Sequence, residues 1–423
     1  MTPLPKQVAI SGIGMVTALG NNSQSTFDSL FSGKNGITEV KEWKESNFPI
    51  QVAGQVKNFN DLLEKTPEAR CFNSRKAIFA VTALREAMKQ AGGNFQEGRG
   101  GLFLGVETGR IDINKLFGMF LKAGSSKGLD HDLFGKSAFH FISRYEALSK
   151  QPFFIPNLLS NVFGLTGEIR SISNACSSSS QAVGEGFRKV ATGELDWAIV
   201  GGTDDMIDLY MAIGFQLLGA LSSDKNPETA CRPFDGKRKG FVLGEGAGML
   251  LIENTERAVK RGVKPIALIS GYSSGASATK ITETTSDGIL FTMDQAMQAA
   301  GVDKNSVDYI NAHGTGTPMN DPAENFAIKT LFGEKAFSIP INSTKSMIGH
   351  LIAAGGAVEA AVVARSIQEG KIHPTINLEN PDPHCDLDYV PKIGREIPIR
   401  NGLSNSLGFA GINSTLVLSK FEG

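Results

Sequence analysis

One cysteine lies where a reactive thiol would be useful. Cys176 follows a short apolar segment, Ile169–Ser173, and precedes a helical pattern over Ser177–Thr192. A strand, a sharp turn and then a helix place the thiol at a helix N-terminus, where exposed amides and the helix dipole lower its pKa from about 8.5. The same amides can bind an oxyanion formed on attack at a carbonyl. A free cysteine is also often a small buried apolar side chain, and this segment alone leaves both interpretations equally open.

The other three cysteines are poorer candidates for chemistry. Cys71 lies near a helix start, Cys231 precedes Arg-Pro, and Cys385 lies in a loop rich in proline and aspartate, so we expect structural roles for them. The four cysteines show no CxxC or CxxxC spacing, which argues against a structural zinc site or a disulfide framework and favours a reducing compartment.

A histidine stands in a glycine loop further along the chain. The run Asn311–Pro318 reads NAHGTGTP and directly follows the apolar segment Asp308–Ile310. The glycines and the proline keep His313 off a helix face, so it projects from a strand end into a loop, the usual place for catalytic groups on an α/β scaffold. A structural histidine is the alternative.

A second histidine follows another loop. The run Asn342–Leu351 reads NSTKSMIGHL, and His350 begins a helix predicted over Leu351–Gln368. A helix N-terminus disfavours imidazolium, so we expect His350 to stay neutral and donate a hydrogen bond. The alternatives are a helix cap for His350 and a solvated surface side chain for Lys345.

Glu324 allows two interpretations. The segment Asp321–Glu324 has the form of a helix start, with Asp321 as N-cap, Pro322 in the first position and Glu324 in the third. Glu324 either closes a capping box or pairs with Lys345 and fixes that loop. The remaining histidines, His131, His140, His373 and His384, have no metal-ligand spacing, and we expect no metal site.

Short apolar runs alternate with helical patterns along the chain, which predicts an α/β fold with sheets covered by helices. The predicted strands are Val8–Ile10, Gly101–Val106, Ile169–Ser173, Trp197–Val200, Gly248–Glu253, Pro265–Tyr272, Tyr309–Ala312, Ile339–Ser343 and Thr415–Leu418. The predicted helices are Arg75–Gln90, Ser177–Thr192, Thr292–Ala300, Ala323–Leu331 and Leu351–Gln368.

The chain shows a weak internal repeat, with a boundary near Asn254–Lys260. The part before the boundary and the part after it each open on a strand and later carry a reactive residue on a loop. We therefore predict two halves, residues 1–255 with the cysteine and residues 256–423 with the two histidines. The phenylalanine-rich segment Gly109–Gln151 predicts an inserted helical cap.

The balance of charges excludes some partners. The 42 basic and 43 acidic residues nearly cancel, so no global field favours nucleic acid or an anionic membrane. No apolar run approaches the roughly 20 residues that span a bilayer, and the N-terminus lacks the pattern of a signal peptide. We expect a cytoplasmic protein.

Taken in order, the cysteine after a strand, HGTGTP, STKSMIGH and Gly408–Gly411 form a specific set. It closely resembles the β-ketoacyl-acyl-carrier-protein synthases of the elongating type, synthase II, within the thiolase-like condensing enzymes. Further matching segments extend the resemblance over nearly the whole chain: Gly12–Thr17, Arg232–Asp235, Gly240–Gly248, Pro374–Asn377 and Asp386–Asp388.

The resemblance implies a five-layered αβαβα fold with pseudo-twofold duplicated halves. It also implies a dimer, with an identical chain or a related ketosynthase-like subunit, and an acyl carrier protein as partner. Substrates would be carried on the phosphopantetheine of that carrier, and no cofactor is implied.

The resemblance also assigns roles to residues. Cys176, His313 and His350 would form a Cys-His-His site, with Lys345 and Glu324 as a pair that orders the histidine loops. Phe409 would gate the nucleophile, and its amide would join that of Cys176 in an oxyanion hole. The remaining matches are Thr315 and Thr317, which would contact the phosphopantetheine arm.

The reaction implied is a decarboxylative condensation. A Cys176 thiolate takes the acyl chain from its carrier, and loss of CO₂ from a malonyl unit then gives an enolate. Two neutral histidine donors would stabilise the developing negative charge. The enolate attacks the acyl–Cys176 carbonyl and yields a β-ketoacyl carrier two carbons longer.

Several departures from the family pattern concern the acyl chain. The nucleophile is followed by a serine run, Ser177–Ser180, the segment 109–151 is longer than usual, and Leu407 replaces a common phenylalanine. Thr108 occupies a position matching the deep end of the acyl pocket. We therefore hypothesise a substrate other than ordinary saturated fatty acyl chains, such as a polyene or polyketide intermediate.

Three other functions fit the sequence less well. A non-catalytic chain-length partner typically lacks the nucleophilic cysteine, which Cys176 argues against. A thiolase would offer a second cysteine near the end, and none follows Cys385. A starter-type synthase would use asparagine in place of His350.

Carrier proteins are acidic, so a basic patch near the channel mouth is expected. Lys65, Arg70 and Lys150 are candidates by rough alignment. An ordinary solvated side chain is an equal alternative for each.

Overall fold

The computed structural model describes residues 6–93, 95–278, 280 and 283–423. Its main feature is a ten-stranded mixed sheet with the order β12-β11-β15-β16-β10-β1-β9-β8-β4-β7. These strands are β1 Val8–Val16, β4 Gly100–Gly105, β7 Glu168–Ile172, β8 Trp197–Asp205, β9 Glu245–Asn254, β10 Ala267–Ala276, β11 Tyr309–Asn311, β12 Ile341–Asn342, β15 Asn401–Leu407 and β16 Ile412–Ser419.

The sheet consists of two halves with the same pattern. In the N-terminal half β7, β4 and β8 are parallel; β9 pairs antiparallel with β8, and β1 pairs antiparallel with β9. In the C-terminal half β12, β11 and β15 are parallel; β16 pairs antiparallel with β15, and β10 pairs antiparallel with β16. The halves meet where β1 pairs with β10 over three residue pairs.

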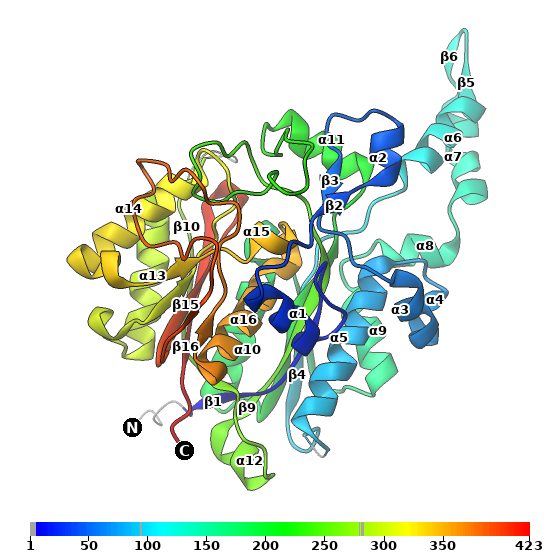
Figure 1. The fold of residues 1–423 in the computed structure, drawn as a ribbon. Coiled ribbons are helices and arrows are strands. Elements are labelled where there is room, and N and C mark those ends of the chain that lie inside the picture. The colour runs from blue at the N-terminus through cyan, green and yellow to red at the C-terminus, as the bar shows by residue number, and fades with distance from the viewer. Residues whose placement is uncertain (1–5, 94, 279, 281–282) are drawn as a thin grey trace.

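Helices complete a layered arrangement around this sheet. The central helices α10 Ser178–Ala191 and α16 Gly355–Glu369 pack against each other and against strands of both halves (Figure 1). The outer face of the N-terminal half is covered by α5 Arg75–Ala91, and that of the C-terminal half by α13 Ser286–Ala300. The predicted α/β class and five-layered αβαβα arrangement are confirmed.

Glycine allows close contact between these layers. A Cβ at Gly14 on β1 would overlap the backbone oxygen of Ala83 on α5, and a Cβ at Gly105 on β4 would overlap the amide of Ser179 on α10. These contacts let the helices lie directly on the sheet, so the strand ends and helix starts converge on one region.

The remaining elements are short or peripheral. They are α1 Ser23–Phe31, β2 Thr38–Glu39, α2 Lys41–Glu45, β3 Val52–Ala53, α3 Phe59–Lys65, α4 Pro67–Arg70, α9 Phe154–Phe163, α11 Leu209–Leu217, α12 Thr255–Lys260, α14 Asn320–Phe332, α15 Lys345–Ile348, β13 Lys371–Ile372 and β14 Arg395–Glu396. Within the described ranges, no helix has both the length and the apolar character that crossing a bilayer requires.

The helix predicted over Leu351–Gln368 begins later than expected. A 3-10 turn, Ile352–Ala354, precedes α16, which starts at Gly355. Ile352 has a left-handed backbone, with φ of 44°, and the amide of Ala353 donates to the Asp204 carboxylate at 3.1 Å. That side-chain acceptor holds the chain in a turn before the helix starts, so His350 is not the first residue of the helix.

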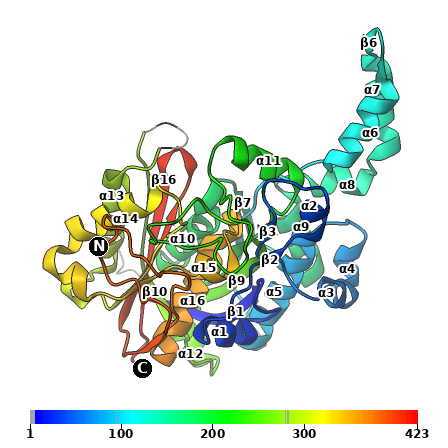
Figure 2. The ribbon, with the colours of Figure 1, turned by 45° about the horizontal axis from the view of Figure 1, so that its top comes forward.

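The segment predicted as a helical cap is helical, but it is not a cap. It contains α6 Ile113–Ala123, a β5–β6 hairpin of Gly124–Ser125 and Gly128–Leu129, α7 His131–Phe141 and α8 Arg144–Ser149. Figures 1 and 2 both show α6 and α7 projecting side by side from the body. We call residues 113–141 the arm. Its apolar side chains Phe117, Leu121 and Phe139 are exposed because no other part of the described chain covers them.

Candidate active site

Cys176 lies in a tight turn between β7 and α10. The turn is a 3-10 segment, Ala175–Ser177, in which Ala175 has a φ of 49°, and it places the sulfur directly before the helix. Cys176 is only 4% exposed, and burial raises the pKa of its thiol to about 12. The expected lowering of this pKa is therefore wrong for the free protein, since desolvation outweighs the stabilising charges and amides.

The local groups that favour the thiolate are nevertheless present. The positive charge of Lys345 and the backbone amides of Cys176 and Phe409 all act to lower the pKa of Cys176, whereas the charge of Glu107 raises it. The two amides lie close enough to the sulfur to interact with it, so the same pair can face an oxyanion on an acyl group attached there.

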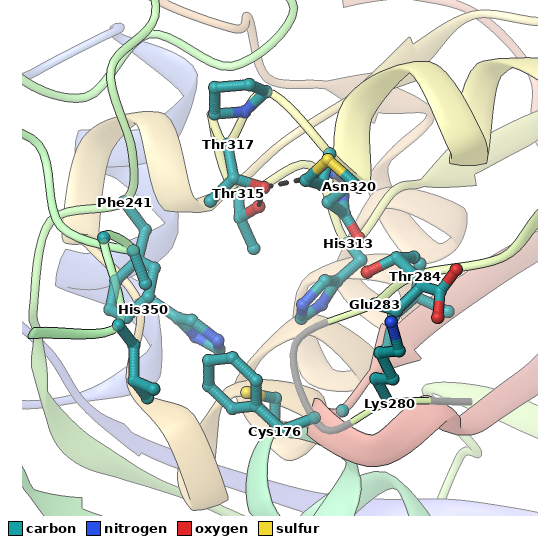
Figure 3. A pocket seen from close by; sticks show the side chains of 18 residues that line it. Cys176, Phe241, Lys280, Glu283, Thr284, His313, Thr315, Thr317, Asn320 and His350 are labelled. Carbon is teal, nitrogen blue, oxygen red and sulfur yellow. Dashed lines mark hydrogen bonds between the residues drawn. The ribbon is translucent and has the colours of Figure 1, made fainter. Parts of the chain in front are cut away.

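Both predicted histidines lie beside the sulfur. The Cys176 sulfur and one ring nitrogen each of His313 and His350 all lie within 4.8 Å of one another. The two imidazole rings are arranged edge to face, with their centroids 5.2 Å apart (Figure 3). They come from different parts of the fold, His313 from the loop after β11 and His350 from the loop after α15. The structure thus brings together three residues that are far apart in sequence.

The two histidines are neutral. Burial, and then the charge of Lys345, lowers the pKa of each well below 6.5. His350 Nδ1 accepts a hydrogen bond from the Ile352 amide at 3.3 Å, which leaves the proton on Nε2. His350 Nε2 and His313 Nδ1 have no hydrogen-bond partner within the described part of the chain. His350 can therefore donate a hydrogen bond from Nε2 to a bound ligand.

Glu324 holds the first histidine loop, but not in either of the predicted ways. Its carboxylate accepts the backbone amides of His313 and Gly314, both at 2.9 Å, and the side-chain amide of Asn405 at 3.1 Å. The helix α14 starts at Asn320, and Asp321 accepts from the amides of Gly316 and Phe234 instead of capping the helix. The predicted capping box and the predicted pair with Lys345 are both wrong, because the carboxylates of Asp321 and Glu324 accept hydrogen bonds from loop amides instead.

Lys345 is buried, and its partner is Glu359 on α16. The two side chains are each 2% exposed, so the interpretation of Lys345 as a surface lysine is wrong. Sequence reasoning missed Glu359. A signal was present, since Glu359 is the acidic residue in the otherwise apolar run 357–364, and a charged side chain on a buried helix face requires a partner.

A cavity of about 450 Å³ leads to these residues. Its inner end is formed by buried side chains, namely Cys176, His313, His350, Phe241 and Leu407, together with Phe409. The mouth is marked by exposed residues, among them Leu218, Lys280, Glu283 and Met319. Between them stand Thr315 and Thr317, whose hydroxyls are 3.0 Å apart (Figure 3).

Phe409 belongs to a set of aromatic side chains that line the way to the sulfur. Its ring stacks on that of Phe215 of α11, with the ring centroids 5.9 Å apart. Phe215 in turn contacts Phe241, and Phe241 contacts the imidazole of His350. Phe409 therefore lies against both the cavity and a helix at its mouth, which fits the position expected of a gate.

Four predicted residues do not line this cavity. Thr108 is exposed where β4 ends, so it is not at the deep end of a pocket formed by this chain alone. Lys65 and Arg70 are exposed at the ends of α3 and α4, and Lys150 is half-buried at the end of α8.

Two carboxylates near the site escaped sequence reasoning. Asp204 is the next-to-last residue of β8, is fully buried and accepts the Ala353 amide, and burial raises its pKa to about 7. Glu107 follows β4 and accepts hydrogen bonds from the turn that holds Cys176. The available signal was an acidic residue at or just beyond the carboxyl end of each apolar strand, where the ends of parallel strands lie together.

The chain is similar to known proteins over its whole length. Residues 5–258 match the family described as Beta-ketoacyl synthase, N-terminal domain, and residues 266–379 match Beta-ketoacyl synthase, C-terminal domain. A 3-oxoacyl-[acyl-carrier-protein] synthase 2 of Staphylococcus aureus (strain COL) is 37% identical, and the alignment covers 99% of each chain.

Two solved structures extend the comparison. One is AntDE:AntF, a type II PKS acyl-carrier protein in complex with its ketosynthase bound to the hexaketide, with a TM-score of 0.86 and 30% identity over 99% of this chain and 100% of that one. The other is the ishigamide ketosynthase/chain length factor, with a TM-score of 0.86 and 28% identity over the same shares.

Proposed function

The chain belongs to the β-ketoacyl synthase family, and from this premise we propose that it is an elongating β-ketoacyl-acyl-carrier-protein synthase. It joins an acyl chain held on Cys176 to a malonyl unit held on an acyl carrier protein. The observation that carries this proposal is the convergence of Cys176, His313 and His350 within 4.8 Å at the inner end of one cavity.

The first step is acyl transfer. The Cys176 sulfur forms a bond to the carbonyl of an acyl thioester, the carrier sulfur leaves, and the thiol proton passes overall from Cys176 to the carrier. The amides of Cys176 and Phe409, which already act on the sulfur, bind the oxyanion of the tetrahedral intermediate. The high pKa of the buried thiol implies that the proton leaves as the carbonyl is attacked.

The second step is loss of CO₂ from the malonyl thioester. The carbon–carbon bond to the carboxylate breaks, and its electron pair forms an enolate whose oxygen becomes negative. Neutral imidazoles of His313 and His350 donate hydrogen bonds to this oxygen, because burial keeps both rings uncharged. In a dry site such donors stabilise developing charge more strongly than water would.

The third step forms the new carbon–carbon bond. The enolate carbon attacks the acyl carbonyl on Cys176, and the two amides again bind the oxyanion. When the oxyanion collapses, the carbon–sulfur bond breaks and Cys176 leaves as a thiolate, which takes up a proton from water to give the thiol of the next cycle. The product is a β-ketoacyl chain two carbons longer on the carrier. A non-catalytic chain-length subunit would not need these three side chains in one cavity, so their convergence favours the enzyme.

The acyl chain is proposed to be a polyene or polyketide intermediate. The support comes from Leu407, which lines the inner end of the cavity, and from likeness to a ketosynthase described with a hexaketide. Thr108 adds no support in the single chain, because it does not line the cavity.

The proposed partners are an acyl carrier protein and a second ketosynthase-like chain. Each of two similar structures includes one such partner, a carrier in one and a chain length factor in the other. Here Thr315 and Thr317 line the passage that a phosphopantetheine arm would follow. Lys65, Arg70 and Lys150 stay candidates for carrier docking, outside the cavity mouth of this chain. The proposed compartment is the cytoplasm, because all four cysteines are free.

Intact-protein mass spectrometry with a panel of acyl-carrier thioesters tests this function. The wild-type chain should gain one acyl group, located on Cys176 after digestion, and should elongate it when malonyl carrier is added. Cys176→Ala should lose both while keeping its unfolding temperature. Cys71→Ala, a change at an exposed free thiol, is the matched control and should behave as wild type. Condensation by Cys176→Ala would refute the assignment, and a preference for ordinary saturated chains of medium length would refute the substrate class.

A further inference from the structure

The nucleophile turn is held by a carboxylate from the neighbouring strand. Glu107 follows β4, which is parallel to β7 on one side and to β8 on the other. The carboxyl ends of these three strands therefore lie next to one another. The Glu107 carboxylate accepts the Ala175 amide at 3.1 Å and the Ser173 hydroxyl at 2.8 Å, with a weaker contact to the Ser178 hydroxyl at 3.4 Å. These donors stand on both sides of Cys176.

The backbone of this turn needs an external acceptor. Ala175 has a left-handed φ of 49°, a conformation that side chains other than glycine adopt at a cost. Its amide points out of the turn to Glu107 Oε1, whereas the amides of Asn174 and Ser177 are bonded within the turn itself. Removing the carboxylate would leave the strained residue without this contact.

Glu107 is itself fixed from behind. Its backbone oxygen accepts a hydrogen bond at 2.7 Å from Lys76, a lysine on α5 that is only 3% exposed. The Lys76 ammonium also lies 4.0 Å from Asp205 at the end of β8. The end of β4 is therefore held in place, and the half-buried carboxylate of Glu107 has a defined direction.

The carboxylate also acts through its charge. It opposes ionisation of Cys176, whereas the charge of Lys345 favours it. Once an acyl group is attached, the sulfur carries no charge, and this repulsion no longer applies.

We propose that Glu107 is a positioning residue for the nucleophile: its carboxylate holds the turn 173–178 so that the Cys176 sulfur faces the cavity, and it places a negative charge near that sulfur. The inference rests on Cys176 being the nucleophile of the proposed reaction. It adds a residue that acts through Cys176 and does not itself touch the substrate.

Two variants separate the charge from the hydrogen bonds. Glu107→Gln removes the charge at nearly constant size and places an amide NH₂ among hydrogen-bond donors. Its pH profile for alkylation of Cys176 by iodoacetamide should move to lower pH by roughly half a unit, since water screens part of the charge of a half-buried carboxylate. Its rate of acyl transfer should fall on the order of 10-fold to 10²-fold, because the sulfur is less well placed.

Ser173→Ala removes one hydrogen bond and keeps the charge. Its alkylation profile should stay at the wild-type pH, while its acyl transfer slows by a few-fold. The matched control is Glu86→Gln, since Glu86 holds the amides of Met15 and Ser23 in the same way, at 3.0 and 2.8 Å, and does not line the cavity. Its alkylation profile should not move.

The result that would overturn the proposal is an unchanged alkylation profile in Glu107→Gln, or an equal shift in Glu86→Gln. If Glu107→Gln does not fold, a wild-type rate of acyl transfer in Ser173→Ala overturns the positioning role. Alkylation measures the thiol without any carrier, so it tests Glu107 even if no acyl carrier proves to be a substrate.

Discussion

At the scale of single residues, Lys345 links the reactive groups of the site. Its charge lowers the pKa of Cys176, His313 and His350 together, and it lies fully buried against Glu359. A cation here favours the thiolate and at the same time adds to the burial that keeps both imidazoles uncharged. The site therefore combines a sulfur that can be deprotonated with two neutral hydrogen-bond donors, which is what acyl transfer and enolate stabilisation each require.

The variant Lys345→Met should change both reactivity and stability. Loss of the positive charge raises the pKa of Cys176 further, so alkylation by iodoacetamide should move to higher pH. It also leaves Glu359 buried without its cation, and breaking such a pair destabilises a protein by about 3–5 kcal/mol. The measurements are the pH profile of alkylation and unfolding in urea.

The double variant Lys345→Met/Glu359→Leu is the control. Replacing both members of a buried pair by apolar groups should recover most of the stability, while the alkylation profile should stay shifted to higher pH. A double variant with the wild-type alkylation profile would contradict the electrostatic role assigned to Lys345.

At the scale of the elements, the sequence predicted most of what positions the site. Alternating apolar runs and helical patterns indicated the strands and the helices α5, α10 and α16, because buried strands and amphipathic helices leave a periodic signal. The residues at loop ends, Cys176, His313 and His350, followed from their place after strands and beside glycines. These features depend on local sequence, which is why they could be predicted.

The errors arose where a distant side chain determines the local structure. The start of α16 is delayed because the Asp204 carboxylate accepts the Ala353 amide, and the start of α14 differs because Asp321 and Glu324 bond loop amides. The pairing of Lys345 with Glu359 likewise depends on how α16 packs. No periodicity within these segments reports a partner that lies elsewhere in the fold.

The close contact of β4 with α10 gives a prediction at this scale. In Gly105→Ala the added Cβ would overlap the Ser179 amide, so the start of α10 and the nucleophile turn must move. Overpacking of this kind costs about 1–3 kcal/mol, and we expect slower acylation of Cys176 as well. Gly214→Ala on α11 is the control, because nothing lies within 4 Å of its Cβ and the helix should gain slightly. Equal urea midpoints for the two variants would contradict the packing argument.

At the scale of the whole molecule, two surfaces are left unpartnered in the single chain. The strand β7 is an edge of the sheet, bonded only to β4 among the described strands, and Ile169 on it is exposed. The arm extends from the same half of the chain and exposes apolar side chains over its length. An open strand edge and a projecting apolar arm are both features that association covers.

We therefore expect a dimer that buries the arm. The double variant Leu121→Ser/Phe139→Ser should raise the dissociation constant by at least about 10²-fold, since burying each such side chain stabilises by about 1.5–3 kcal/mol. Ile393→Ser, a change at an exposed apolar residue outside the arm, should leave it unchanged. Sedimentation equilibrium measures both. A wild-type chain that is monomeric at micromolar concentration, alone and with a related ketosynthase-like chain, would contradict the expectation.

The buried ionisable groups predict how stability depends on pH, with opposite signs for two of them. Burial lowers the pKa of His373 to about 4, so the unfolded chain takes up its proton near pH 6.5 and the folded chain does not. The contribution of this histidine is therefore fully present above pH 6.5 and is lost as the pH falls toward 4. Burial raises the pKa of Asp204 to about 7, so its contribution is present below about pH 4 and is lost as the pH rises through 7.

Between pH 4.5 and 6.5, each group should change the free energy of unfolding by up to about 1.4 kcal/mol per pH unit. As the pH falls through this range, the stability of wild type relative to His373→Asn should decrease, and its stability relative to Asp204→Asn should increase. Urea unfolding at several pH values measures both slopes, and Gly214→Ala, which changes no ionisable group and adds a Cβ with nothing within 4 Å, should show neither. Slopes of the same sign for His373→Asn and Asp204→Asn would contradict the opposite effects of burial on stability that are expected from the lowered pKa of His373 and the raised pKa of Asp204.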